Sequence, residues 1–382
     1  MSQLVIEPSG IISITGLLSL AVLTLHFIIP YIYYYITGNL WVKREWEIAP
    51  SRDHTPMVTV IVPTYNEEST ISEKLDNLKS QDYPRDKLEV LVIDSASTDS
   101  TVERVREWAS RNPSFPLRLI REKERRGKAN ALNKALRDSK GEVIIITDAD
   151  ALWESRDTLA RAIEWLGDPS VGAVSCLKRP TATGPGGFEA RYRAHYNQIR
   201  LGESKKHSTP IFHGELAAFR RKCLEALGGF PTNLGADDSH TATLIAVRGR
   251  RAITPDGVYC LEKLPIDKNH YHQWRIRRAQ HLVQHFSTSL RLIPKAPKGF
   301  RFILALEAYI HVFNPWLLWV GLVLLGLAAF SSFLFLALLL AFIAAIVVIS
   351  DLKAWVIGQV YLTIGAVRNL WSKELIWSKQ EK

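Results

Sequence analysis

Two long uncharged stretches flank a central region in which apolar and polar residues form short blocks. The first runs from Pro8 to Val42 and the second from Ala308 to Ser350. As helices they would measure about 52 Å and about 65 Å, against roughly 30 Å for the hydrocarbon core of a bilayer. The pattern predicts an N-terminal transmembrane anchor in residues 1–45 and a transmembrane helical hairpin in residues 302–350, hinged at Ser331-Ser332.

The central blocks have the lengths of strands and helices. Short runs rich in β-branched and other apolar residues predict strands at 57–63, 88–94, 117–122 and 142–148. Helical patterns occupy 68–80, 100–111 and 128–139. Alternating strands and helices predict an α/β fold with a mostly parallel, Rossmann-like sheet, here assigned to residues 53–290.

The segment after the hairpin is rich in tryptophan and tyrosine. Only fourteen uncharged residues separate Lys353 from Arg368, which is short for a span. We therefore expect residues 353–382 to form an amphipathic segment that lies in the membrane interface.

The distribution of charged residues predicts how the protein is oriented in the membrane. Lysine and arginine number 48 against 38 aspartate and glutamate, a formal net charge of +10, and basic residues flank the uncharged stretches. The positive-inside rule then predicts a multi-pass protein of the cell membrane with its central domain in the cytoplasm. The same charge suits the headgroups of a lipid bilayer, and no nucleic-acid motif is present, so no nucleic-acid partner is expected. Three cysteines without CxxC spacing suit a reducing compartment and predict no zinc site.

Polar and acidic residues follow three of the predicted strands. The first strand ends in PTYNEE, the second at Asp94 and the fourth in Asp148-Ala149-Asp150. The carboxyl ends of parallel strands share one edge of a sheet, where ligands bind. Asp148 and Asp150 suit a hard divalent cation that also holds phosphate, although a lone pair of this kind is also typical of a solvated turn or a helix cap.

Two further residues suit parts of a nucleotide. Lys128 opens the helix GKANALNKAL, and a basic residue at a helix N-terminus is suited to diphosphate oxygens. Asp94 is placed to accept hydrogen bonds from a base or ribose, or else to form an Asx turn with the residues that follow it.

Together these segments carry a family resemblance. VIVPTYNEE, VIDSASTDST, GKANALN, TDAD and ADDSHT, in this order within residues 58–282, resemble glycosyltransferase family 2, whose catalytic domain has the GT-A fold. The resemblance extends to membrane-bound prokaryotic and archaeal sugar transferases related to dolichyl-phosphate mannose synthase and to cellulose, chitin and hyaluronan synthases. It implies inverting, metal-dependent transfer of a sugar from a nucleotide sugar.

The resemblance also implies a donor site. The residues that it assigns to the nucleotide are Pro63, Thr64, Tyr65, Glu67, Asp94, Lys128 and Asp148. Asp148 and Asp150 would be the ligands of Mg²⁺ or Mn²⁺.

A catalytic base is implied at Asp238. Ala236-Asp237-Asp238 stands where the family has Thr-Glu-Asp, whose last residue is the general base. An inverting displacement needs a carboxylate that takes the proton of the acceptor hydroxyl, and Asp237 would support this group. The departure in the first two positions leaves open which of the two aspartates is the base.

The acceptor side is predicted from two more segments, and helices near 188–206 and 270–290 are expected beside it. Residues 188–206 mix aromatic and basic residues at helical spacing, which suits either the membrane and the acceptor site or an ordinary surface helix. His213-Gly214 resembles an acceptor-side segment of the family, with a third metal ligand at His213 as a further use. Arg275, Arg277 and Arg278 lie where polymerising relatives carry Gln-x-x-Arg-Trp and would meet the diphosphate or the acceptor; contact with lipid headgroups is the alternative. The Gln and Trp of that motif are absent at the matching spacing.

The sequence thus predicts a membrane-bound inverting hexosyltransferase that acts on a lipid-linked or glycan acceptor at the cytosolic face. GDP-mannose is favoured over a UDP-sugar as the donor. A UDP-sugar-dependent processive polysaccharide synthase is the first alternative, and the missing Gln and Trp argue against it. The second is a non-catalytic membrane scaffold with a GT-A domain.

Overall fold

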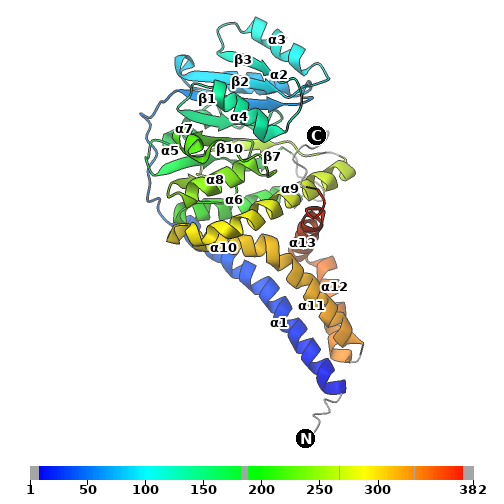
Figure 1. Cartoon of the computed structure of the whole chain (residues 1–382). Helices are drawn as coiled ribbons and strands as arrows, with labels where there is room; N and C mark the ends of the chain where they lie inside the picture. Colours follow the sequence, from blue (N-terminus) through cyan, green and yellow to red (C-terminus); the bar gives the residue numbers. More distant parts are fainter. Residues whose placement is uncertain (1–7, 182–187, 266, 331, 373–382) are drawn as a thin grey trace.

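The chain folds as an α/β domain from which long helices project on one side (Figure 1). The structure is a computed structural model that describes residues 8–181, 188–265, 267–330 and 332–372. A seven-stranded sheet forms the centre of the domain, with the strand order β3-β2-β1-β4-β8-β6-β9. These strands are β1 (Val58–Thr64), β2 (Leu88–Asp94), β3 (Leu117–Arg121), β4 (Val143–Ile146), β6 (Val171–Ser175), β8 (Ala217–Arg220) and β9 (Arg251–Ile253).

The four predicted strands are confirmed as β1 to β4, and they pair in parallel. Only β8 runs antiparallel to its neighbours β4 and β6. The sheet is therefore mostly parallel, as predicted. Pro63 lies beyond Ile61, the last residue of β1 that pairs with β4, so its missing N–H removes no bond on that side.

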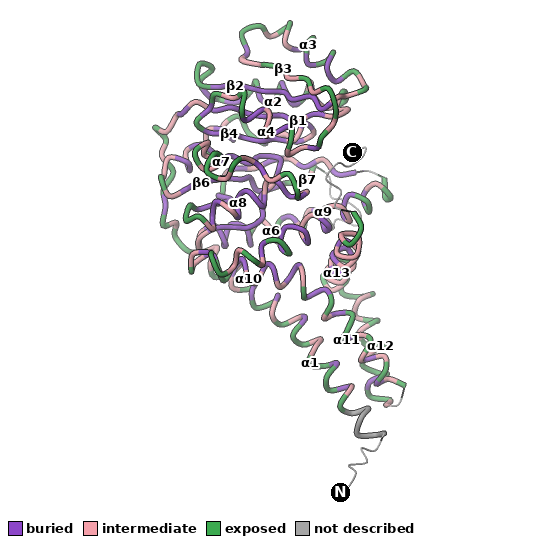
Figure 2. The backbone as a smooth tube through the Cα atoms, in the orientation of Figure 1, coloured by how far each residue is buried: buried purple, intermediate pink, exposed green. Residues whose placement is uncertain are grey.

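Helices cover both faces of the sheet, which explains why its central strands are mainly apolar and buried (Figure 2). In β1, Val58, Val60 and Val62 face one core, and Ile61 faces the other. The first core is covered by α2 (Ile71–Lys79), α3 (Thr101–Arg111) and α5 (Thr158–Trp165), and the second by α4 (Lys128–Asp138), α7 (Arg221–Leu227) and α8 (Asp237–Val247).

A second layer lies between the sheet and the projecting helices. A small sheet has the order β5-β10-β7, and α6 and α9 occupy the two segments in which the sequence indicates helices. The elements are β5 (Leu152–Trp153), β7 (Leu177–Pro180), β10 (Tyr259–Glu262), α6 (Phe188–Lys206) and α9 (Lys268–Ser289), with short turns η3 (Arg85–Lys87) and η5 (Leu290–Lys295).

Two of the projecting helices are long and apolar enough to cross a membrane. They are Ile14–Lys43 and Lys298–Ala329, with mean hydropathy 1.8 and 1.9. The first comprises most of α1 (Pro8–Tyr35) with η1 (Ile36–Leu40) and η2 (Trp41–Lys43), and the second comprises α10 (Lys298–Ala308), η6 (Tyr309–Phe313) and α11 (Asn314–Ala329). They pack side by side, and Ser19 Oγ donates to Gly321 O at 2.8 Å.

The last two helices are sharply bent against each other. α12 (Phe333–Val348) and α13 (Ser350–Arg368) meet at 101° and make a third span if the pair counts as one. α13 packs on α9, where a Cβ on Gly365 would lie 2.6 Å from Gln280 N. The hinge residue Ser331 and the termini 1–7 and 373–382 lie outside the described residues. The interfacial location of 353–382 stays a prediction.

A buried ionic cluster joins the domain to the projecting helices. Arg200 of α6 pairs with Glu203 at 2.8 Å and with Glu307 of α10 at 2.9 Å, and Tyr33 of α1 donates to Glu203 at 2.5 Å. Helix α6 also approaches η1 so closely that a Cβ on Gly202 would lie 2.1 Å from the carbonyl oxygen of Thr37. The domain is therefore held against the projecting helices by direct contact.

This close approach predicts that Gly202→Ala destabilises the protein. A methyl group against a backbone carbonyl cannot be accommodated by side-chain rotation, so we expect a loss of about 1–3 kcal/mol. The thermal midpoint of the detergent-solubilised protein measures it. Gly38→Ala is the matched control, because a Cβ at Gly38, which also lies in η1, meets no atom within 4 Å. Equal midpoints for the two variants would contradict the expectation.

Candidate active site

A cavity of about 1010 Å³ opens at the carboxyl edge of the large sheet and extends to the C-terminal part of α1 and to residues 350–362 of α13. The polar strand ends predicted from the sequence lie on its wall, together with parts of α6, α8 and α9. The predicted site residues in its lining are Pro63, Thr64, Tyr65, Glu67, Lys128, Asp148, Asp150, His213, Gly214, Asp237, Asp238, Arg275, Arg277 and Arg278.

Asp94 is the predicted site residue that does not line the cavity. It ends β2 and is fully buried, while its neighbour Ser95 reaches the cavity wall. Oδ2 accepts a hydrogen bond at 3.2 Å from the N–H of Ser97, three residues on rather than the two of an Asx turn, whereas Oδ1 has no hydrogen-bond partner among the described residues. Asp94 therefore lies behind the cavity wall, and its contact with a base or ribose stays a prediction.

The loops after β1 and β2 are joined to each other. Asn66 has a left-handed φ of 56°, its N–H donates to Ser97 Oγ at 2.9 Å, and its Oδ1 accepts from Thr98 N at 2.8 Å. The ring of Tyr65 lies 3.7 Å from the guanidinium of Arg125, which precedes α4. These contacts join the part of the cavity wall that carries the predicted nucleotide residues, and they include a cation–aromatic pair.

The carboxylates of Asp148 and Asp150 follow β4 and face the cavity. The N–H of Asp148 donates to Gly214 O at 3.0 Å, which joins this turn to the His213-Gly214 segment. Carboxylate oxygens suit Mg²⁺ or Mn²⁺, and Mg²⁺ is commonly bound by one or two carboxylates together with substrate phosphates. Among the described residues, no group of three or more His, Cys, Asp or Glu side chains is arranged to hold a metal. His213 as a third ligand stays a prediction. The residues fit a cation shared with a diphosphate.

Lys128 lies at the centre of the acidic residues. Its Nζ is 2.7 Å from Asp148 Oδ1, and a Cβ on Gly214 would lie 3.0 Å from both Lys128 Nζ and Asp148 Oδ2. Burial lowers the pKa of Lys128, but Asp148, Asp237 and Asp238 outweigh burial and raise it above its usual range. Lys128 is therefore a permanent cation at the point where a diphosphate would meet the acidic groups.

Asp237 and Asp238 form the first turn of α8, where the helix N-terminus stabilises negative charge. The N–H of Ser239 donates to Asp238 Oδ1 at 2.6 Å, and Asp237 Oδ2 is buried without a hydrogen-bond partner among the described residues. Burial, followed by the charge of Asp237, raises the pKa of Asp238 to about 7, and burial also raises that of Asp237. A carboxylate with such a pKa suits proton transfer near neutral pH.

Beyond Gly214 the cavity wall rests on a buried ionic network. Glu262 of β10 is 2.9 Å from Lys178 Nζ, 2.7 Å from Arg193 Nε and 2.6 Å from Arg278 Nη1. Burial alone would raise the pKa of Glu262, but these three cations hold it well below its usual range. Lys178 also pairs with Glu215. This network fixes the relative positions of α6, α9 and the small sheet.

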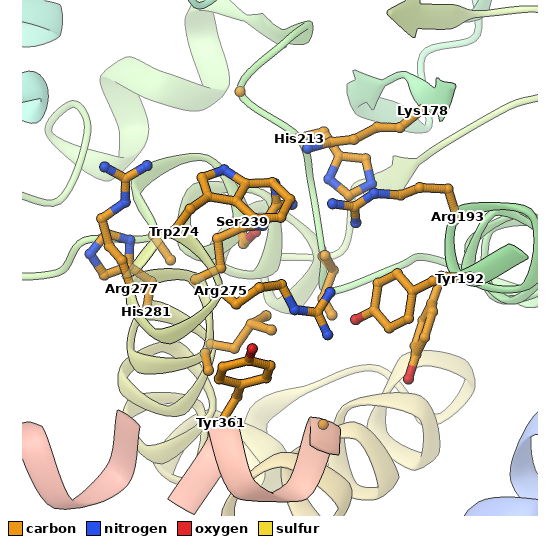
Figure 3. Close-up of a pocket in the computed structure, with 18 of the residues that line it drawn as sticks. Lys178, Tyr192, Arg193, His213, Ser239, Trp274, Arg275, Arg277, His281 and Tyr361 are labelled. Carbon is orange, nitrogen blue, oxygen red and sulfur yellow. The ribbon is translucent and has the colours of Figure 1, made fainter. Parts of the chain in front are cut away.

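The three predicted arginines of α9 differ in their surroundings. Arg278 pairs with Glu262, and Arg275 pairs with Glu189 at 2.9 Å, so both already neutralise a buried carboxylate. Arg275 is 8% exposed, which contradicts its contact with lipid headgroups. Arg277 lies further along the same cavity wall (Figure 3).

The sequence did not predict four residues of the cavity wall, which are Lys178, Tyr192, Arg193 and Tyr361. Figure 3 shows Lys178 and Arg193 beside His213, and the rings of Tyr192 and Tyr361 on either side of Arg275. The guanidinium of Arg275 lies 4.6 Å from the ring centroid of Tyr192 and 5.4 Å from that of Tyr361. The mixed aromatic and basic residues of 188–206 fitted either an acceptor-side helix or an ordinary surface helix, and the acceptor role of α6 stays a prediction. Only the fold brings Tyr361 beside Arg275 and Tyr192.

Both the sequence and the structure are similar to those of known glycosyltransferases. The sequence model described as glycosyl transferase family 2 matches residues 59–228. The structure is similar to that of the mannosyltransferase PcManGT from Pyrobaculum calidifontis in complex with GDP-Man and Mn²⁺. That similarity has a TM-score of 0.86 and 54% identity and covers 94% of this chain and 100% of the other. The chain belongs to glycosyltransferase family 2. The predicted GT-A fold is thereby confirmed.

Curated members of the family match over shorter regions. The N-acetylglucosaminyltransferase of Rhizobium meliloti is 30% identical over 220 residues, which are 53% of this chain and 50% of that protein. Glycosyltransferase AglE of Haloferax volcanii is 27% identical over 228 residues, 59% of this chain and 73% of that protein. The chain thus spans half the length of the first of these family 2 relatives.

Proposed function

We propose that this protein is a membrane-bound inverting glycosyltransferase that transfers mannose from GDP-mannose to a lipid-linked acceptor at the cytoplasmic face of the cell membrane. The observation that carries the proposal is that one cavity is lined both by the acidic groups at the sheet edge and by residues of α1 and α13. A donor bound at the sheet edge and an acceptor bound in the membrane would meet in this cavity.

The donor assignment rests on the sheet edge. Asp148 and Asp150 would offer carboxylate oxygens to a divalent cation, and Lys128, 2.7 Å from Asp148, would meet the diphosphate. The Pyrobaculum calidifontis mannosyltransferase, which is 54% identical, was solved with GDP-Man and Mn²⁺ and supports GDP-mannose and Mn²⁺ over UDP-linked donors.

The acceptor assignment rests on the other end of the cavity. Its wall there includes Phe27, Tyr31 and Tyr35 of α1 and Trp355 of α13. Tyr31 and Tyr35 are 66% and 51% exposed on a helix apolar enough to cross a membrane. Aromatic residues of this kind are typical of membrane–water interfaces, so this end suits a substrate that enters from the lipid. A soluble glycan would not need such an opening.

In the proposed reaction, Asp238 takes the proton of the acceptor hydroxyl while that oxygen attacks the anomeric carbon. The bond from this carbon to the diphosphate oxygen breaks at the same time, and GDP leaves with its electron pair. Asp237 supports Asp238, and Lys128 stabilises negative charge on the leaving group. A bound Mg²⁺ or Mn²⁺ would supply further neutralisation of the diphosphate.

The first test is thermal stability with GDP, UDP or UMP, each with and without Mn²⁺. A ligand at 100 times its Kd stabilises a protein by about 2.7 kcal/mol, so specific binding should be visible as a raised midpoint. We expect a Mn²⁺-dependent rise with GDP that is lost in Asp150→Asn. A rise with UDP alone would replace the donor by a UDP-sugar, and no rise in folded protein would overturn the donor site.

The acceptor is tested with radiolabelled GDP-mannose and two substrates, a total lipid extract and soluble oligosaccharides. We expect label to pass into the organic phase with the lipid extract. Labelling of the soluble oligosaccharides alone would replace the lipid-linked acceptor by a glycan.

A further inference from the structure

Lys74 is a fully buried cation directly behind the turn that carries Asp148 and Asp150. It lies on α2, on the same face as the core residues Ile71, Leu75 and Leu78. Its Nζ donates to Thr147 Oγ1 and to Ala151 O, each at 2.6 Å. These two acceptors come immediately before and after Asp148-Ala149-Asp150, so one ammonium group holds both ends of the acidic turn.

The hydrogen bonds continue from Lys74 to the opposite wall of the cavity. Thr147 Oγ1 donates to Glu215 O at 2.6 Å, and Trp153 Nε1 donates to the same oxygen at 3.0 Å. The next residue of the turn, Asp148, bonds through its N–H to Gly214 O. Lys74 is thus linked, through Thr147, to the Gly214-Glu215 segment, which lies against Lys128.

Core stability alone does not account for a lysine at this position. Burial disfavours its charge and lowers its pKa to about 8, while the carboxylates of Asp148 and Asp150 are among the groups that favour the charge. Its hydrogen-bond partners are neutral oxygens, which compensate a buried charge less well than a carboxylate does. An apolar side chain would fill the same place in the core at lower cost. A lysine at this position is therefore best explained by its hydrogen bonds to the turn that carries Asp148 and Asp150.

We propose that Lys74 is a positioning residue that holds Asp148, Asp150 and the adjoining Gly214 backbone in the arrangement that binds the divalent cation and the donor diphosphate. The inference rests on the proposed metal-dependent donor binding. Residues that orient metal ligands in this way commonly change metal affinity or activity by 10–100-fold when they are replaced.

The test is the affinity for Mn²⁺ in the presence of GDP, measured by electron paramagnetic resonance of free Mn²⁺ without any turnover. We expect Lys74→Met and Thr147→Val to weaken Mn²⁺ binding by about 10–100-fold. Thr147→Ser keeps the hydroxyl and is expected to retain binding. If Lys74 and Thr147 act as one unit, the double variant will lose less than the sum of the two single losses in free energy.

Leu78→Ala is the control for general destabilisation, because Leu78 is equally buried on α2 but lies in the sheet core. We expect it to lower the thermal midpoint and leave Mn²⁺ affinity within a factor of two or three. Parent-like Mn²⁺ affinity in Lys74→Met and Thr147→Val, or an equal loss in Leu78→Ala, would overturn the inference. If Lys74→Met does not fold, the Thr147→Val and Thr147→Ser pair decides alone. A parent protein that binds neither Mn²⁺ nor GDP would overturn the proposed function, and this inference with it.

Discussion

Asp238→Asn is expected to lower kcat by about 10²–10⁴-fold, the usual contribution of a general base. The amide keeps the shape of the side chain and its contact with the N–H of Ser239 but cannot accept the acceptor's proton. Because Asp238 is not one of the two proposed metal ligands and Asp148, Asp150 and Lys128 stay unchanged, the midpoint rise with GDP and Mn²⁺ should persist. Initial rates under saturating GDP-mannose measure the effect.

Asp237→Asn is the matched control, because it is the adjacent carboxylate in the same helical turn. A dead Asp237→Asn beside an active Asp238→Asn would move the base to Asp237. The pKa of about 7 for Asp238 adds a second readout. The base is active when it is deprotonated, so kcat/KM of the parent should fall as the pH drops below about 7. Any residual activity of Asp238→Asn should not show this fall at low pH.

Glu262→Gln is expected to lower the free energy of unfolding by about 3–5 kcal/mol, because it removes the negative charge that three cations share in the interior. The side chains of Glu262, Lys178 and Arg193 are 3%, 2% and 7% exposed, so water cannot replace the lost partner. We expect a large drop in the thermal midpoint of the detergent-solubilised protein.

Glu154→Gln provides the comparison for an exposed ion pair. Glu154 lies 2.7 Å from Arg179, but the two side chains are 29% and 53% exposed. Such pairs contribute about 0.2–1 kcal/mol, so this variant should keep nearly the parent midpoint. If the two variants lose equal stability, the buried network does not carry the energy assigned to it.

The elements that the sequence predicted well are those whose burial repeats at short range. β1, β2 and β4 are buried along nearly their whole length because helices cover both faces of the sheet, and their mainly apolar sequences are visible within seven residues. The acidic turn could be predicted because it directly follows one of these buried strands. Asp148 and Asp150 come directly after a buried strand, and parallel strands deliver their carboxyl ends to one edge.

The ion pairs of the cavity wall were not predictable in this way. Arg275 and Arg278 are basic residues on a polar helix face, which fits a diphosphate, a headgroup or a carboxylate equally well. Their partners Glu189 and Glu262 are 86 and 16 residues away, on α6 and β10. Lys74 left a local signal, a lysine among the apolar positions of α2, but its acceptors lie 73 and 77 residues away.

The sequence by itself therefore determined the α/β domain, the uncharged helices and the acidic residues at the strand ends. Each depends on periodicity or on position relative to one element, and both are local properties of the chain. Only the tertiary structure decided which charges pair, that Asp94 lies behind the cavity wall, and that α13 turns back onto α9. These depend on which groups lose water together, and that is set by packing between segments far apart in the chain.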